Sequence, residues 1–184
     1  GTAISYEANK NIIVYERVED RAGNYEYYST DNIVIDNKSS SKSDISITVS
    51  PEEPKNGKGI YNFDEIENLS FNIRVVEPVG EYENKEVYSG IKCIQYKIVD
   101  EKSERAEEIK NFGREEHIKE YSDTIKIEPD KSYSSDYTIT VSVEDWSGNT
   151  AESDPLTITV DPVKPEVENK YESEATTENN YYNK

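Results

Sequence analysis

Apolar residues recur at every second position in six separate runs of the sequence, and each run has a single apolar face. This period of two is typical of β-strands, whose successive side chains point to opposite faces of a sheet. Parallel sheets would require near-continuous apolar strands and helical crossovers, which the sequence lacks. We therefore predict an all-β fold in which two antiparallel sheets pack face to face. The runs are 45–49, 69–75, 94–98, 125–127, 139–143 and 156–160.

One segment between the third and fourth runs departs from this alternation. Residues 103–119 are rich in Glu, Lys and Ala, which favour helices. Ser103 stands where a helix N-cap would be, and Ile109 and Phe112 are one helical turn apart. We predict a short helical or irregular insertion around 103–119.

The composition limits both the core and the partners of the chain. Hydrophobic and charged residues each make up 33% of the 184 residues, so the core is thin. A sandwich suits this composition, because each strand needs an apolar residue only at every second position. The net charge of −18 would repel nucleic acid and anionic membrane surfaces, and we expect neither as a partner.

No apolar run is long enough to span a bilayer, and no signal-peptide pattern opens the chain. With Gly1 in place of an initiator Met, we expect a piece of a longer protein.

A stretch of the N-terminal region repeats near the C-terminus. Residues 18–24 (VEDRAGN) align with residues 143–149 (VEDWSGN), at an offset of 125 residues. The same offset places residues 33–36 (IVID) on residues 158–161 (ITVD). One offset that holds across two strands and their turn indicates an internal repeat.

The repeat suggests how the chain is divided. We interpret residues 1–36 as the C-terminal strands of a preceding unit and residues 37–161 as one complete domain. Residues 162–184 would be a linker and the first strand of the next unit, since Tyr181-Tyr182-Asn183 resembles Ile60-Tyr61-Asn62.

Three stretches resemble the bacterial Ig-like repeats that occur in tandem in large extracellular proteins of low-GC Gram-positive bacteria. Residues 89–98 are similar to the third strand of that family, and residues 135–150 to its last hairpin. Residues 161–165 (DPVKP) are similar to its Pro-bearing linker, whereas the first linker has Ser and Lys instead. The resemblance implies an Ig-like (fibronectin III-like) sandwich and a secreted or cell-surface location. It also implies a spacer or adhesive role with neighbouring repeats as partners, and brings no catalytic residues.

The repeated Asp-x-x-Gly-Asn motif is predicted to shape a turn. In each copy the aspartate can accept hydrogen bonds from the turn, and the glycine can take the positive φ of a hairpin bulge. The residues concerned are Asp20, Gly23 and Asn24, and Asp145, Gly148 and Asn149.

Calcium is the one cofactor that the sequence brings into consideration. Asp36, Asp145, Asp154 and Asp161 lie at or near predicted strand ends and linkers. Ca²⁺ binds six to eight oxygens, so two or three carboxylates with some carbonyls would suffice. The alternative is a plain solvated acidic surface, which the lack of an EF-hand loop or a Gly-rich nonapeptide repeat favours.

Nothing in the sequence points to an enzyme. Cys93 and His117 are the only cysteine and histidine, so an intrachain disulfide, a zinc cluster of these residues and a signalled catalytic triad are not expected. An acidic chain offers many carboxylate pairs, and the sequence singles out none of them. Two alternatives to a spacer stay open. One is a module that binds glycans or a host protein through aromatic residues such as Trp146, and the other is an accessory domain of an extracellular enzyme.

Overall fold

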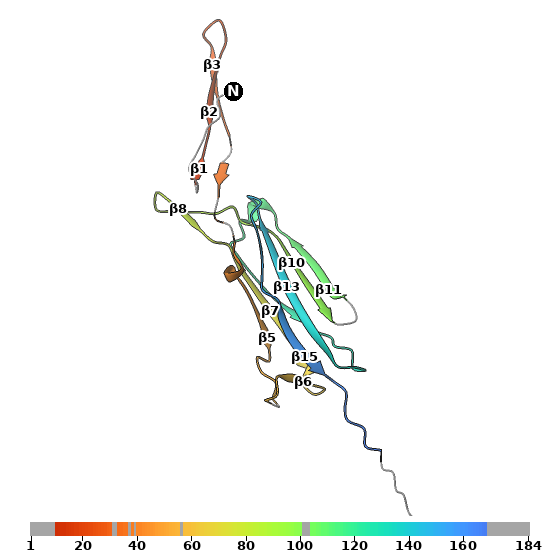
Figure 1. Cartoon of the computed structure of the whole chain (residues 1–184). Helices are drawn as coiled ribbons and strands as arrows, with labels where there is room; N and C mark the ends of the chain where they lie inside the picture. The colour runs from red at the N-terminus through yellow and green to blue at the C-terminus, as the bar shows by residue number, and fades with distance from the viewer. Residues whose placement is uncertain are drawn as a thin grey trace, which may run out of the picture.

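A computed structural model of the protein describes residues 10–30, 33–36, 38, 40–55, 57–100 and 104–168. The predicted all-β sandwich is confirmed: most of the strands between residue 45 and residue 161 form two packed layers, which Figure 1 shows as one elongated body. Short 3₁₀ turns, not α-helices, interrupt the strands of the described part. The 3₁₀ turns are η1 (Lys42–Asp44), η2 (Ile66–Asn68) and η3 (Arg114–Glu116). No helix in the described ranges has the length and apolar character needed to cross a membrane.

The smaller layer has the order β12-β7-β5, and all of its pairs are antiparallel. Its central strand β7 (Ser70–Val76) lies between β5 (Ile45–Ser50) and β12 (Glu120–Lys126). Phe71, Ile73 and Val75 of β7 are buried and alternate with more exposed residues, as the sequence pattern predicts.

The larger layer has the order β11-β10-β13-β15-β6, with β14 paired to β13. One pair departs from the predicted antiparallel arrangement, because β6 runs parallel to β15. The strands are β6 (Ile60–Asn62), β10 (Ile91–Asp100), β11 (Glu104–Asn111), β13 (Ser135–Asp145), β14 (Thr150–Glu152) and β15 (Leu156–Asp161).

The core lies between the two layers and comes from all six predicted runs. The strands of these runs contribute alternate side chains, and this explains how a chain with few apolar residues fills a continuous interior. The largest fully buried apolar side chains are Tyr137, Phe71, Leu69, Ile73, Ile91, Ile94 and Ile139.

The prediction of a short helical or irregular insertion around 103–119 is wrong for residues 104–111, which are an ordered strand, and holds only for the turn that follows. Residues 104–111 form strand β11, which pairs with the edge of β10. Ile109, predicted to share a helix face with Phe112, is exposed, whereas Phe112 packs against the core. Only η3 is helical, and Ser103 lies outside the described residues.

The four strands before residue 36 form a separate projection, here called the N-terminal arm (residues 10–35). Strand β1 (Lys10–Ile12) pairs with β4 (Ile33–Ile35), and β2 (Tyr15–Glu19) pairs with β3 (Tyr25–Ser29). Every residue of β2 and β3 is exposed. Figure 1 shows this ribbon extending beyond one end of the sandwich.

The arm repeats the strand pairing of the last hairpin of the sandwich. In the arm Val18 pairs with Glu26, and 125 residues later Val143 pairs with Ala151. Likewise Ile12 pairs with Ile33, and Tyr137 with Ile158. All three described pairs of β1–β4 and of β13–β14 have counterparts at this offset, so the arm and residues 135–160 share one backbone register.

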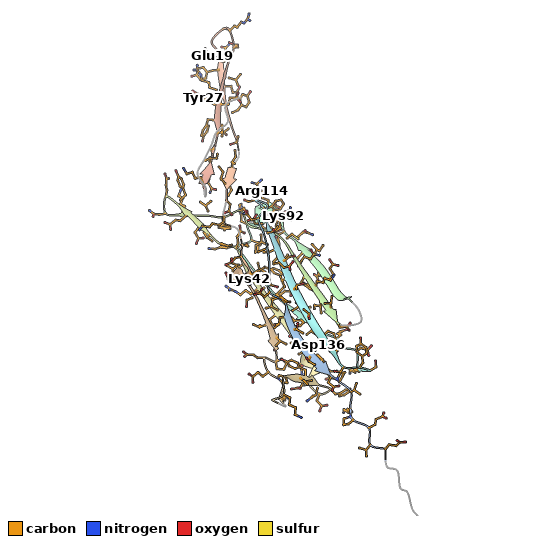
Figure 2. All side chains as sticks on the ribbon, in the orientation of Figure 1. Glu19, Tyr27, Lys42, Lys92, Arg114 and Asp136 are labelled. Carbon is orange, nitrogen blue, oxygen red and sulfur yellow. The ribbon has the colours of Figure 1, made fainter. Side chains whose placement is uncertain are left out.

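The arm and the C-terminal segment lie at opposite ends of the sandwich (Figure 1). Figure 2 places Glu19 and Tyr27 on the arm, Lys92 and Arg114 at the adjoining end of the sandwich, and Asp136 towards the other end. A small hairpin of β8 (Gly80–Tyr82) and β9 (Lys85–Val87) flanks the junction with the arm. Residues 169–184, which include the predicted first strand of a next unit, lie outside the described residues.

Candidate functional site

Three acidic side chains meet where the arm joins the sandwich. One carboxylate oxygen from each of Asp36, Glu77 and Asp145 lies within 4.8 Å of the other two. Glu77 and Asp145 are each 1% exposed, and Asp36 is 9% exposed. Because charged side chains are rarely this buried without a partner, the cluster is the most unusual chemical feature of the described residues.

Glu77 directly follows β7 and points its carboxylate at a turn before β10. Its backbone N–H donates to the carbonyl of Lys119 at 2.9 Å, which fixes the end of the strand. Its Oε1 atom accepts hydrogen bonds from the backbone N–H of Gly90 (2.9 Å) and from the N–H and hydroxyl of Ser89 (both 3.1 Å). Its other oxygen, Oε2, is buried and has no hydrogen-bond partner among the described residues.

Asp145 ends β13 and holds the tight turn that follows. Its Oδ1 atom accepts the N–H groups of Ser147 and Asn149 at 2.8 Å each, and Oδ2 accepts the side-chain amide of Asn149 at 2.7 Å. Gly148 adopts a φ of 87°, which favours glycine. The same bonds recur in the arm. There Asp20 Oδ1 accepts the N–H groups of Ala22 and Asn24, Oδ2 accepts the side-chain amide of Asn24, and Gly23 has a φ of 89°.

Asp36 brings the arm into the cluster. It follows β4 directly, its Oδ1 atom accepts the N–H of Lys38 at 2.9 Å, and its Oδ2 atom accepts the N–H of Ser89 at 2.9 Å. Ser89 N–H is therefore shared between Asp36 and Glu77. This backbone group links the first residue after the arm to the sandwich.

Burial and mutual repulsion set the electrostatics of the cluster. Desolvation raises the pKa of Glu77 to about 7, and the charges of Asp145 and Asp36 add to this, against the opposing hydrogen bonds from Gly90 and Ser89. No lysine or arginine within the described ranges forms an ion pair with any of the three carboxylates. The site can therefore bind a proton or a cation.

Only two of the four aspartates that the sequence proposed for calcium come together. Asp36 and Asp145 belong to the cluster, but Asp154 is exposed and forms an ion pair with Lys42 at 2.9 Å. Asp161 is also exposed, and its Oδ1 atom accepts the N–H of Val163 at 3.2 Å. Sequence reasoning missed Glu77, since a single glutamate after an alternating strand is ordinarily solvated.

Trp146, proposed as an aromatic contact, is only partly exposed. Its indole Nε1 atom is buried and finds no hydrogen-bond partner in the described ranges, and its backbone N–H donates to the carbonyl of Gly90 at 2.9 Å. Most of the exposed aromatic residues in the described part lie instead on the arm, where Tyr25 and Tyr27 pack edge to face at 5.7 Å, and Tyr82 of β8 is a further one.

His117 and Cys93 take no part in the carboxylate cluster. The His117 ring packs edge to face against Tyr88 at 6.5 Å, beside a shallow groove of 590 Å³ between the arm and the sandwich. Cys93 is a free, partly buried thiol on β10, and burial raises its pKa.

Comparison with known proteins does not assign the chain to a family. The sequence matches no protein-family model, and no curated protein matches it.

Proposed function

We propose that this chain is a non-catalytic structural segment of a secreted or cell-surface protein, in which Ig-like sandwiches follow one another in series. Residues 37–161 are one complete unit, residues 1–36 end the unit before it, and residues 162–184 begin the next. The role of such a segment is to extend a rod that carries binding or anchoring parts away from the cell surface.

The observation that carries this proposal is the shared register of the arm and residues 135–160. Strand pairs, turn hydrogen bonds and the positive-φ glycine all recur at an offset of 125 residues. A lone two-stranded ribbon is marginally stable in water. The arm is therefore best explained as part of a unit whose remaining strands precede residue 10.

The arrangement of the ends supports the same proposal. The arm adjoins one end of the sandwich and the C-terminal segment leaves the other (Figure 1), as connection in series requires. Asp161 at the exit occupies the repeat position of Asp36 at the start, so each unit could meet the next in the same way.

A catalytic reading of the carboxylate cluster has less support. A carboxyl group with a pKa near 7 has the acidity that general acid–base catalysis uses. However, Glu77 is 1% exposed, so a substrate has no access to it without rearrangement of the sandwich.

Force spectroscopy of engineered chains tests the proposal. Residues 37–161 would be repeated directly after Asp161, so that each Asp161 takes the place of Asp36. We expect chains with one, two and three copies to give one, two and three unfolding events of equal released length, because each unit has its own core. A single event whose length grows with copy number would contradict the proposal.

A further inference from the structure

We propose that Asp36, Glu77 and Asp145 bind one Ca²⁺ ion at the junction between the arm and the sandwich. The inference deepens the proposed function, on which its role at repeat junctions rests, but the ion site itself stands on the geometry of this chain alone.

The unpaired oxygen of Glu77 is the first argument for a cation. Within the part of the chain that the structure describes, Oε2 is buried without a hydrogen-bond partner in a side chain that is 1% exposed, whereas Oε1 of the same group accepts three hydrogen bonds. A buried polar atom without a partner costs about 1–3 kcal/mol, and more if it is charged. One oxygen of the same carboxylate lies within 4.8 Å of an oxygen of Asp36 and of Asp145, which add negative charge and no N–H donor, so a cation satisfies the Glu77 carboxylate well.

The spacing and number of the carboxylates favour calcium among divalent ions. Oxygens bound to Ca²⁺ lie about 2.3–2.6 Å from the ion, so two of them are at most about 5 Å apart. The three ligand oxygens already lie within 4.8 Å of one another. Mg²⁺ usually keeps several waters and uses one or two carboxylates, whereas Ca²⁺ accepts a protein cage of several carboxylates.

The position of the ligands gives the ion a mechanical consequence. Asp36 directly follows β4 of the arm, whereas Glu77 and Asp145 belong to the sandwich. An ion bound by all three joins two bodies whose direct strand pairing is otherwise separate. Calcium would therefore fix the direction of the arm relative to the sandwich, and would do so again at each junction where Asp161 replaces Asp36.

Calcium titration of the purified chain, followed by calorimetry and by Tb³⁺ luminescence, tests the site. Trp146 follows Asp145 directly and is a sensitiser close to the proposed ion. We expect one Ca²⁺ per chain, weaker binding of Mg²⁺, and displacement of Tb³⁺ by Ca²⁺. Asp36→Asn and Glu77→Gln should each weaken calcium binding by at least about tenfold.

Asp161→Asn is the matched control, because Asp161 has the same repeat position as Asp36 but is exposed and outside the cluster. Its calcium affinity should equal that of the unaltered chain. Circular dichroism of each variant verifies the fold, and Asp36→Asn, at the more exposed ligand, is the variant least able to disturb the core. Absence of binding at millimolar Ca²⁺, or an equal loss in Asp36→Asn and Asp161→Asn, would overturn the site.

The mechanical consequence has a separate readout in NMR relaxation of backbone amides. With Ca²⁺, arm and sandwich amides should report one rotational correlation time, and in chelator or in Glu77→Gln the arm should report a shorter one. Identical values with and without Ca²⁺ would overturn the coupling. None of these measurements depends on repeats in series, so failure of the ion site and failure of the proposed spacer function can be told apart.

Discussion

Replacing Ile158 with alanine is expected to lower the free energy of unfolding of the sandwich by about 3 kcal/mol. Ile158 is 7% exposed, pairs with Tyr137 on β13 and belongs to the core between the two layers. Removing three carbon atoms there leaves a cavity that the facing sheet cannot fill. Chemical denaturation of the purified chain, monitored by circular dichroism, measures this change.

Ile33 is the control for that experiment, because it has the same repeat position and the equivalent pairing to Ile12. It is 38% exposed, since no described sheet covers the arm. Ile33→Ala should therefore change the unfolding free energy of the sandwich by less than about 0.5 kcal/mol. Equal effects of the two substitutions would show that the arm and the sandwich unfold together, contrary to the division proposed here.

In the presence of a chelator, the sandwich is expected to lose about 2 kcal/mol of stability between pH 5.5 and pH 8.5. The pKa of Glu77 is raised to about 7 in the folded protein, above the usual 4.5 of an unfolded chain. The folded state therefore holds the proton on Glu77 more tightly than the unfolded state does. This proton binding stabilises the fold fully below pH 4.5, and the stabilisation disappears as pH rises through 7. Unfolding free energies from denaturant titrations at several pH values measure the loss.

Two comparisons assign that pH dependence to Glu77. Glu77→Gln keeps the shape but cannot ionise, so its stability should change little over the same pH range. Saturating Ca²⁺ should also flatten the curve, because the ion favours the charged carboxylate over the protonated one. An unchanged slope in Glu77→Gln would assign the effect to other groups.

The alternating pattern was sufficient to predict the layers of the sandwich. All six runs fall on strands or directly beside them: Leu69 precedes β7, and Ile127 follows β12, where its N–H donates to Leu69 at 3.0 Å. Such strands are predictable because one face is buried and a shift by one residue would expose it.

Strand β11 could not be predicted in this way, because it is a strand only through its pairing with the neighbouring strand β10. Its Glu- and Lys-rich sequence favours a helix, but pairing along β10 satisfies its backbone, and Tyr96 of β10 donates to Glu108 at 2.7 Å. Residues 107–111 of this edge strand are all exposed, and its charges protect the edge from further pairing.

The carboxylate cluster was only half predictable for a different reason. Asp36 and Asp145 stand in repeated motifs at strand ends, which the sequence displays. Glu77 carries no such signal, and it enters the cluster only because β7 ends beside the turn of Ser89 and Gly90. A contact between segments far apart in the sequence is a property of the packed sheets and not of local pattern.

Small-angle X-ray scattering of chains with one and two copies of residues 37–161, joined through Asp161, tests the central claim most directly. For units in series, the radius of gyration should nearly double with the second copy. The radius of gyration of a compact globule grows with about the 0.38 power of the number of residues. Doubling the number of residues therefore increases it by only about 1.3-fold. A near-doubling is the result expected for a rod of repeated sandwiches, and an increase close to 1.3-fold would contradict it.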